Sequence, residues 1–143
     1  MMTAYIKPLP VAKPWSKKFW EAARQHKLIM QKCSDCGKLI FYPRKVCPEC
    51  WSSNVGWIDV SGKAKVLMMT TTIAGVEQAF APDLPYVLAV VELEEGVHMM
   101  TNIVDCKPED VKIGMAVEVV FRDCTDEISL PVFRPIQGRG SER

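Results

Sequence analysis

Four of the six cysteines stand in two C-x-x-C pairs, Cys33 with Cys36 and Cys47 with Cys50, with ten residues between the pairs. Two such pairs supply four thiolates for one tetrahedral ion, and each pair folds as a tight turn whose backbone N–H groups point at sulfur. Sulfur fills all four corners of such a site, so no position is left for water or substrate. The pattern therefore predicts a structural zinc site, not a catalytic one.

Residues beside the ligands fit this interpretation, and two other uses of the thiols stay open. Gly37 allows the left-handed backbone that closes the first turn, and Pro48 stiffens the second. A disulfide framework needs an oxidising compartment, and iron bound as in rubredoxin uses the same four ligands. The other two cysteines, Cys106 and Cys124, have no partner at ligand spacing and are interpreted as buried thiols.

The residues before the first cysteine pair predict one amphipathic helix, from Trp15 to Lys27. Pro14 precedes the helix and Ser16 is a candidate cap for its first turn. Apolar side chains gather on one side of this helix, and the basic residues lie elsewhere on it. The helix therefore carries most of the positive charge at this end of the chain.

Short strands are expected on either side of the first cysteine pair, at residues 28–31 and 39–42, as in a zinc ribbon. Trp51 and Trp57 follow the second pair closely. Large aromatic side chains here are expected to wedge the ribbon against the next unit of the fold.

Five β-rich runs follow Trp57, and glycine, proline or other turn residues bound each of them. They cover residues 63–73, 86–93, 97–104, 116–122 and 129–134. Residues 107–112 have a proline near the start, acids in the first turn and a glycine just past the end, which predicts a helix. A closed five-stranded barrel with one helix between its third and fourth strands is the OB-fold arrangement. Three units are therefore predicted: a helical segment at 1–28, a zinc ribbon at 29–56 and an OB-fold domain at 57–143.

The near-neutral total charge conceals an asymmetry along the chain. With 18 basic and 17 acidic side chains, the 143 residues have a net charge of +1. Residues 1–32 carry seven basic side chains and one acid, a local charge of +6, whereas residues 57–143 carry −6. The basic segment indicates an anionic partner, although a solvated helix face explains the same lysines.

The sequence shows no catalytic constellation. His26 and His98 have no sequence neighbour that indicates a nucleophile or a second metal site, and no glycine-rich phosphate loop is present. No apolar run approaches the ~20 residues that span a bilayer, and the first residues do not resemble a signal peptide. We therefore expect a cytoplasmic protein with no catalytic residue of its own and no membrane contact.

Several segments, taken in this order, resemble the DUF35 family. The resemblance covers nearly the whole chain and rests on residues 19–23, 33–37, 43–50, 85–96, 101–104 and 113–119. A double C-x-x-C is shared by many ribbons, but the strands Pro-Tyr-x-x-Ala-x-Val-Glu-Leu at 85–93 and Ile-Gly-Met-x-Val-Glu-Val at 113–119 are specific. The resemblance implies a mostly β fold with an N-terminal helix, a rubredoxin-like zinc ribbon and a C-terminal five-stranded OB-fold barrel.

The same resemblance implies a function. It points to a non-catalytic accessory subunit that binds, or helps to bind, acyl-CoA. Such a subunit would stabilise a thiolase-like partner enzyme, such as a thiolase, aldolase or hydratase, in a hetero-oligomer. The CoA phosphates would then lie on the basic helix, with Lys17, Lys18, Arg24 and Lys27 as the candidate ligands.

Two other functions remain open. Zinc ribbons and OB-folds are both common modules for single-stranded nucleic acid, but the −6 of residues 57–143 would repel phosphate. A free-standing acyl-CoA-binding protein is the second alternative, and tight CoA binding by the isolated chain would favour it.

Overall fold

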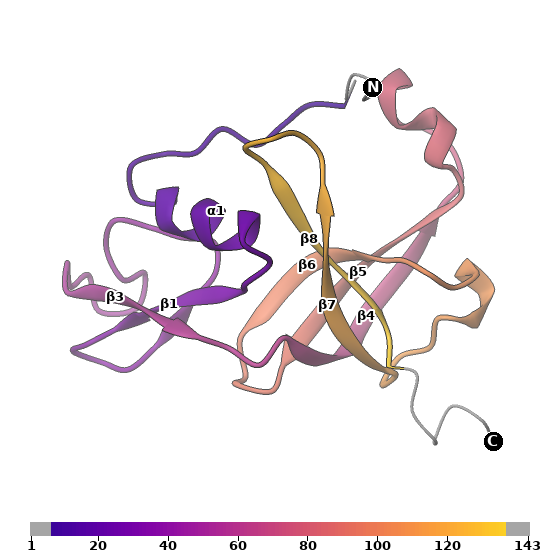
Figure 1. The fold of residues 1–143 in the computed structure, drawn as a ribbon. Helices are drawn as coiled ribbons and strands as arrows, with labels where there is room; N and C mark the ends of the chain where they lie inside the picture. The colour runs from indigo at the N-terminus through magenta and orange to yellow at the C-terminus, as the bar shows by residue number, and fades with distance from the viewer. Residues whose placement is uncertain (1–6, 137–143) are drawn as a thin grey trace.

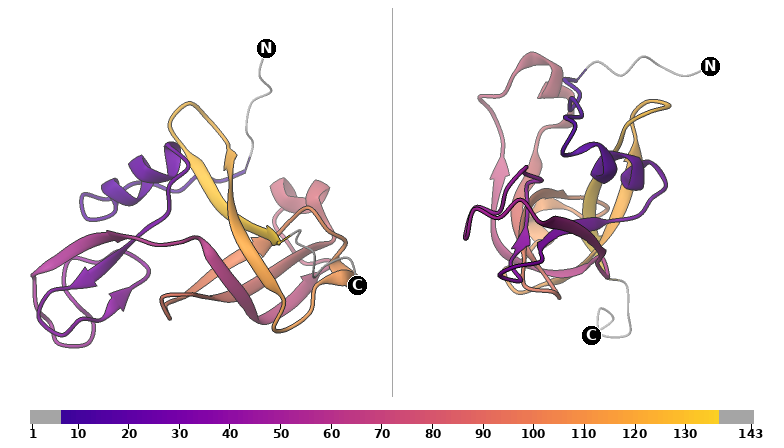
Figure 2. Two further views of the ribbon diagram at one scale, coloured as in Figure 1. Left: turned by 60° about the horizontal axis from the view of Figure 1, so that its bottom comes forward. Right: turned by 90° about the vertical axis from the view of Figure 1, so that its left-hand side faces the viewer.

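A short helix, a three-stranded sheet and a closed five-stranded barrel follow one another along the chain (Figure 1). The computed structural model describes residues 7–136, and within this range no helix is long and apolar enough to cross a lipid bilayer. The sheet and the barrel lie at opposite ends of the molecule, with the helix α1 (Lys17–Arg24) beside both (Figure 2). The predicted mostly β fold class is confirmed.

Helix α1 is shorter at both ends than the predicted helix. The chain leaves it after Arg24, and His26 adopts a positive φ of 61°, which is incompatible with a continued right-handed helix. Ser16 occupies the cap position, but its hydroxyl accepts a hydrogen bond from the backbone N–H of Lys13 at 2.9 Å and none from the helix. Ser16 therefore takes the predicted cap position, but its side chain caps no helix N–H and instead closes the turn that leads into α1.

The three-stranded ribbon sheet has the order β2-β1-β3, with β1 at Ile29–Cys33, β2 at Leu39–Ile40 and β3 at Val55–Asp59, and both pairings are antiparallel. Side chains alternate between the two faces of a strand. On β1, Cys33 belongs to a small buried cluster in the ribbon, whereas Met30 is buried in the same cluster as the barrel core. The sheet therefore joins the metal-binding end of the molecule to the barrel.

Strand β3 is the one ribbon strand that the sequence patterns do not predict. It contains Trp57, which is half-buried and packs against the barrel core as expected of a wedge. Trp51 is 80% exposed, so the predicted wedging role of this residue is wrong. Strand β3 also spans residue 57, where the predicted ribbon meets the predicted barrel domain, and the division at this residue stays a prediction.

The barrel confirms the predicted OB-fold. Its strands lie in the order β4-β5-β6-β8-β7, and each of them begins and ends within one residue of its predicted range. A 3₁₀ helix, η1 (Gln78–Asp83), lies between β4 and β5. The five strands are β4 (Lys63–Thr72), β5 (Tyr86–Leu93), β6 (His98–Ile103), β7 (Ala116–Asp123) and β8 (Ser129–Pro135).

The helix expected between β6 and β7 is only a single 3₁₀ turn, η2 (Pro108–Asp110). The next residue, Val111, takes an extended conformation with φ −80° and ψ 128°, and its side chain is buried in the barrel core. Burial of this apolar side chain draws the chain out of the turn, so the local helix signals are overridden by packing. The predicted helix over residues 107–112 is therefore wrong in length.

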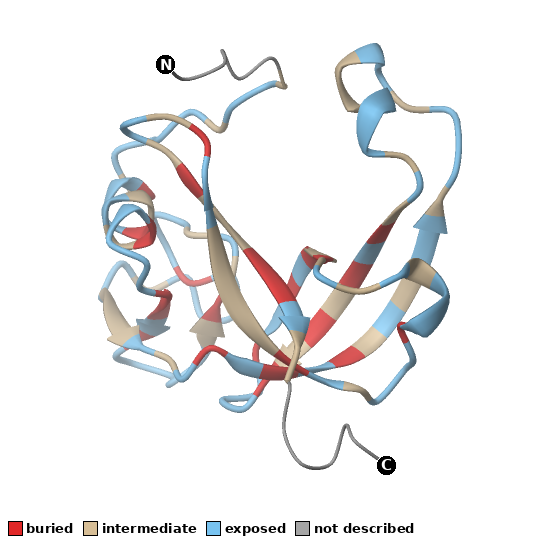
Figure 3. Cartoon of the chain, turned by 45° about the vertical axis from the view of Figure 1, so that its right-hand side comes forward, coloured by how far each residue is buried: buried red, intermediate tan, exposed pale blue. Residues whose placement is uncertain are grey.

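Buried residues alternate with more exposed ones along β5, β6 and the first half of β4, and the buried side chains fill the barrel interior, whereas β7 and β8 alternate less regularly. Figure 3 colours the chain by this burial. Phe133 of β8 is the largest fully buried side chain. One close approach requires glycine: Gly62 has φ 82°, and a Cβ there would lie 2.6 Å from Cγ1 of Val119. Gly62 therefore lets the chain enter β4 directly beside β7.

Candidate functional site

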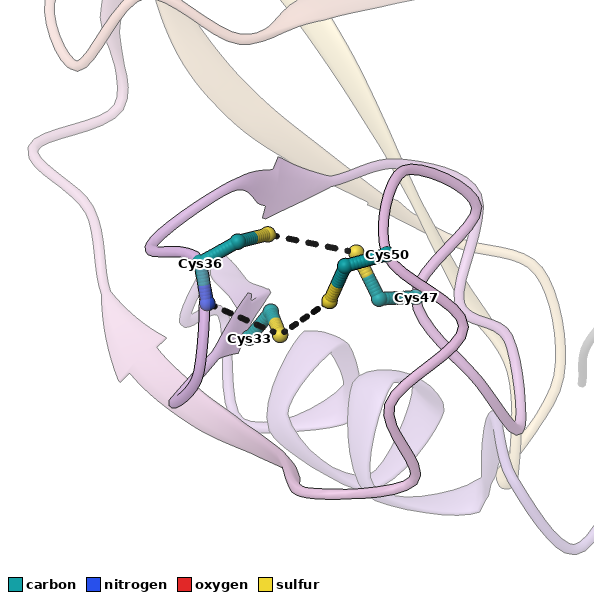
Figure 4. Close-up of side chains that lie close together, drawn as sticks. All are labelled: Cys33, Cys36, Cys47 and Cys50. Carbon is teal, nitrogen blue, oxygen red and sulfur yellow. Dashed lines mark hydrogen bonds between the residues drawn. The ribbon is translucent and has the colours of Figure 1, made fainter.

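The four predicted ligands meet in one cluster at the far end of the ribbon (Figure 4). Their sulfur atoms all lie within 4.8 Å of one another, with 3.6 Å from Cys33 to Cys50 and 3.6 Å from Cys36 to Cys47. Four atoms placed about 2.3 Å from a central zinc ion form a tetrahedron with edges of about 3.8 Å. The spacing of the sulfurs therefore fits one zinc ion.

Two matching turns position these sulfurs. In the first, the backbone N–H of Gly37 donates to the carbonyl of Cys33 at 2.9 Å, and in the second that of Trp51 donates to the carbonyl of Cys47 at 2.9 Å. Both residues that close the turns have a positive φ, 80° for Gly37 and 67° for Trp51. The second turn thus has the same backbone path as the first, with a tryptophan where the first has glycine.

The turns also direct N–H groups at the ligands. The backbone N–H of Cys36 lies 3.5 Å from Sγ of Cys33, and that of Glu49 lies 3.3 Å from Sγ of Cys47. Such contacts stabilise negative sulfur, as a thiolate–metal bond requires.

The pKa values of two thiols show how the cluster distributes its protons. The Cys36 backbone N–H is the main cause that lowers the pKa of Cys33 to about 7. The Ser52 backbone N–H lowers the pKa of Cys50, but the adjacent sulfur of Cys33 and desolvation outweigh it and raise that pKa to about 12. Four crowded sulfurs cannot all become thiolates on their own, so a divalent cation is the natural replacement for their protons.

The donor set and the geometry therefore agree with a structural metal. Cys33 and Cys47 are buried, and all four sulfurs come from the protein, which leaves no open coordination position. A closed four-sulfur site of this kind stabilises the fold of the ribbon and offers no place for a reacting water. We assign the site to structural zinc.

The other two cysteines lie away from this cluster. Cys124 is buried, as predicted, and its thiol donates weakly to the carbonyl of Arg122 at 3.6 Å. Cys106 is only half-buried, so the prediction for it is too strong. Desolvation, with the nearby carboxylates of Asp110 and Asp105, raises the pKa of the Cys106 thiol.

Three of the four predicted CoA-binding cations lie on α1, and the fourth follows it. Lys17, Lys18 and Arg24 are exposed on α1, where Lys18 lies about 100° around the helix axis from Lys17. Lys17 lies 4.0 Å from the carboxylate of Glu21, so its charge is partly offset. The role of these side chains in binding CoA stays a prediction.

Lys27 lies beyond the end of α1, and its ammonium group is 3.4 Å from the carboxylate of Asp59 on β3. This ion pair joins the residues after the helix to the ribbon sheet. Both partners are more than half exposed, so the pair adds little to stability.

His26, just beyond the end of α1, makes a structural contact with the barrel. Its Nε2 lies 2.8 Å from Oδ1 of Asp123, and its ring stacks on Phe121 with 5.3 Å between ring centres. The Ser129 hydroxyl donates to the same oxygen of Asp123. The histidine therefore contacts a carboxylate and an aromatic ring, and the serine hydroxyl bonds the carboxylate, so these groups do not form a nucleophile–base pair.

Sequence reasoning missed two features of this end of the molecule. It did not identify Trp51 as the counterpart of Gly37, because a tryptophan gives no signal for a positive φ. It also did not single out Arg44 and Lys45. These two residues line one cleft together with Trp15 and Lys18. Their separation in the sequence from the basic helix hid this proximity.

Comparison with known proteins places both units in one family. A family model described as the ChsH2 rubredoxin-like zinc ribbon domain matches residues 20–56. A second, described as the ChsH2 C-terminal OB-fold domain, matches residues 57–122. The two matches are adjacent and follow the order of the ribbon and the barrel in this chain.

Two relatives differ in how much of their own length this chain covers. It is 34% identical over 130 residues to the probable enoyl-CoA hydratase alpha subunit of Thermomonospora curvata, a match that covers 91% of this chain but 40% of that one. It is 38% identical over 136 residues to the DUF35 domain-containing scaffold protein of Pyrococcus furiosus, where the match covers 91% of this chain and 96% of the other.

A solved structure gives the same result in three dimensions. A chain of the structure described as an Ltp2-ChsH2(DUF35) aldolase superposes with a TM-score of 0.79 at 34% sequence identity, over 89% of this chain and 98% of that one. With its two matched domains and its near full-length relative, the chain belongs to the DUF35 family.

Proposed function

We propose that this protein is a non-catalytic accessory subunit of a cytoplasmic, thiolase-like enzyme complex that processes acyl-CoA. The observation that carries the proposal is the likeness to the DUF35 chain of an aldolase, which extends over 98% of that chain. The name of the Pyrococcus relative, a scaffold protein, and that of the Thermomonospora relative, a hydratase alpha subunit, point in the same direction.

The architecture is consistent with a supporting role. The metal site is closed by four sulfur ligands, so its metal orders the ribbon and does not activate water. A partner subunit, such as a thiolase, aldolase or hydratase, would supply the residues that make or break bonds in the acyl group. This chain would stabilise that partner and help it to bind acyl-CoA.

The partner can be tested directly. The tagged, zinc-loaded chain should co-purify from its native host with a thiolase-like protein, and the two should co-elute in size-exclusion chromatography with a fixed mass ratio by light scattering. The partner expressed alone should be less soluble or less active than the pair. A chain that elutes alone, and a partner that is fully active without it, would refute the accessory role.

Acyl-CoA binding is the finer part of the proposal, and the charge of the basic helix supports it. CoA carries a 3′-phosphate and a pyrophosphate, which Lys and Arg bind through charge-assisted hydrogen bonds. Calorimetry with CoA and dephospho-CoA should show weaker binding by a Lys17→Ala/Lys18→Ala/Arg24→Ala variant. A Lys63→Ala/Lys65→Ala/Lys112→Ala variant, which removes the same charge from the barrel, is the matched control. Equal affinities for the wild type and both variants would exclude the helix from the site.

A further inference from the structure

An apolar groove of about 420 Å³ opens where the N-terminal segment, α1, the ribbon and the barrel meet. Its lining includes Trp15, Phe19, Trp20, Phe41, Tyr42 and Met100, so aromatic rings supply much of its surface. Tyr42 is 58% exposed and Met100 is 53% exposed, which is unusual for large apolar side chains that line a common concavity. We call this concavity the apolar groove.

A second concavity of about 390 Å³ adjoins the groove, and Trp15 lines both. We call it the basic cleft, because Lys18, Arg44 and Lys45 are its charged lining residues. Lys45 Nζ lies 5.0 Å above the centre of the Trp15 ring, at cation–π distance. None of the described residues that line the groove or the cleft is acidic, and Lys13 is the one charged residue in the lining of the groove.

The basic cleft is built on a buried polar contact. The Gln31 side chain is buried on β1, and its Oε1 accepts a hydrogen bond from the Arg44 backbone N–H at 2.7 Å. Its Nε2 donates to the Arg44 carbonyl at 2.9 Å. This double contact holds the segment that carries Arg44 and Lys45 against the ribbon sheet, so the two cations are presented from a fixed backbone.

The charges of the cleft are not neutralised by neighbours. Lys17 and Lys27 of the basic segment have carboxylates within 4.0 Å. Lys18, Arg44 and Lys45 have none at that distance within residues 7–136. Uncompensated cations beside an apolar groove fit an amphipathic ligand with one polyanionic end.

We propose that the basic cleft binds the phosphates of acyl-CoA through Lys18, Arg44 and Lys45, and that the apolar groove receives its pantetheine arm and acyl group. This assignment rests on the proposed function, since acyl-CoA is the ligand class. It places the phosphates at the junction of α1 with the ribbon, and not along the length of α1. Lys18 is the only member of the original four that lines the cleft.

The character of the lining favours a thioester ligand over a protein segment. Small-molecule sites typically have a volume of about 300–1,000 Å³ and a lining of apolar and aromatic groups with a few well-placed polar groups. Ligand sites of this kind also favour boundaries between structural units, and this groove lies where the N-terminal segment, α1, the ribbon and the barrel meet. A docking partner is the rival occupant, and the experiment below separates the two.

The phosphate half of the proposal is tested with two charge-matched triple variants of the full, zinc-loaded chain. The first is Lys18→Ala/Arg44→Ala/Lys45→Ala, and the second is Lys17→Ala/Arg24→Ala/Lys27→Ala. Calorimetry should show that the first variant binds CoA at least tenfold more weakly and loses the preference for CoA over dephospho-CoA. The second should stay within about twofold of the wild type. Equal losses in both variants would overturn the cleft, because they would indicate only the general charge of the basic segment.

The acyl half is tested with Met100→Glu in the groove and Met68→Glu on β4, where Met68 is 57% exposed and lies outside the groove. The wild type should bind octanoyl-CoA at least tenfold more tightly than acetyl-CoA. Met100→Glu should abolish that gain, and Met68→Glu should retain it. A gain that survives in Met100→Glu would overturn the assignment of the groove.

The outcomes also separate this inference from the proposed function. Both calorimetric series are repeated on the chain purified with its partner, so that a site completed in the complex is measured. Partner association without CoA binding in either form would refute this inference and leave the accessory role intact. CoA binding at the cleft by a chain that has no partner would support this inference and refute the accessory role. Loss of the partner by the cleft variant, with its CoA affinity unchanged, would show that the surface docks a protein and would overturn the inference.

Discussion

The metal end of the ribbon and the barrel are stabilised in different ways, and β1 (Ile29–Cys33) connects them. The cluster around the metal site contains three buried residues, Cys33, Ile40 and Cys47, with Val55 packed against it. The barrel core contains fifteen buried residues, and it extends past the barrel to Phe19 on α1 and Met30 on β1. The turns therefore depend on the metal, whereas α1, one face of the ribbon sheet and the barrel share a hydrophobic core.

This difference shows that the boundary of stability does not follow the boundary of the sequence motifs. A unit of this size in the ribbon cannot bury a core of its own, so it needs a metal or a neighbour. The face of the sheet that carries Cys33 is held by the metal, and the face that carries Met30 packs on the barrel core. We therefore expect the metal-dependent turns to unfold independently of the elements that pack on the shared core, which are α1, one face of the ribbon sheet and the barrel.

Removal of the metal should have the largest effect. Binding of a structural zinc contributes ~10–16 kcal/mol in zinc-finger peptides, far more than the small cluster around Cys33 can supply. Chelation, or Cys47→Ser, should abolish hydrogen-exchange protection in residues 33–54 and leave the barrel strands protected. Elemental analysis of the wild type should give one zinc per chain, and iron at that ratio would correct the metal assignment.

The matched control for that experiment is Cys124→Ser, which changes a buried thiol outside the metal cluster. It should retain the metal and the protection of the turns. Simultaneous loss of protection in the barrel after chelation would contradict the separation of the two regions.

Truncation of the barrel core should have the next largest effect. Phe133 is fully buried, and replacement of a core phenylalanine by alanine costs about 3–5 kcal/mol. Phe133→Ala should lower the urea midpoint of the barrel, followed by near-ultraviolet circular dichroism, and a metal content of one per chain should persist. Ile113→Ala, at a side chain that is 72% exposed, should change stability by less than about 0.5 kcal/mol. Loss of metal from folded Phe133→Ala protein would show that the turns depend on the barrel.

A third comparison concerns the two turns themselves. Gly37 and Trp51 have the same left-handed backbone, which costs a residue with a Cβ about 1–2 kcal/mol relative to glycine. Gly37→Ala should therefore weaken metal binding in chelator competition by about 1 kcal/mol, and Trp51→Gly should strengthen it by a similar amount. Trp51→Ala keeps the Cβ and should give no gain. A gain in Trp51→Ala as large as in Trp51→Gly would assign the effect to the indole instead of the backbone.

The smallest expected effect lies at the contact of His26 with the β7–β8 hairpin. The Ser129 hydroxyl, and then His26, lower the pKa of the Asp123 carboxyl below its ordinary value. A carboxyl with a lowered folded-state pKa stabilises the fold above its unfolded pKa, and this contribution is lost as the pH falls through the folded value. The stability advantage of the wild type over Asp123→Asn, measured at about pH 5, should therefore shrink as the pH falls below about 4.

This difference is measured by denaturation at a series of pH values, so that acid release of the metal affects both proteins alike. Asp126→Asn, in the same hairpin, is the control and should show no such pH-dependent difference from the wild type. A difference for Asp123→Asn that grows in acid would contradict the direction of the pKa shift.

The sequence allowed accurate prediction wherever one local signal decided the structure. The C-x-x-C spacing located every metal ligand, and the β-rich runs between turn residues located every barrel strand to within one residue. Prediction failed where packing or backbone strain decided instead. Burial of Val111 shortened the expected helix after residue 107, and the positive φ of His26 ended α1 early.

The environment of the cations could not be predicted for a related reason. Ion pairs such as Lys27 with Asp59 join residues that are far apart in the sequence, so a count of charges along the chain cannot show which cations remain unpaired. The contact of Gln31 with the backbone of Arg44 is equally non-local. It is this contact that brings a second basic segment to the helix.

The position of β8 (Ser129–Pro135) has a consequence for synthesis of the protein. All strand pairs of the ribbon sheet lie within Ile29–Asp59, whereas β6 and β7 both pair with β8. At ~5–20 residues per second, β8 leaves the ribosome roughly 4–14 seconds after the ribbon is complete. During that interval the nascent chain can already bind its metal, while β4, β5 and β6 form an open sheet with an exposed interior. A stalled or truncated chain would therefore be a zinc-loaded client for chaperones, not an unfolded polypeptide.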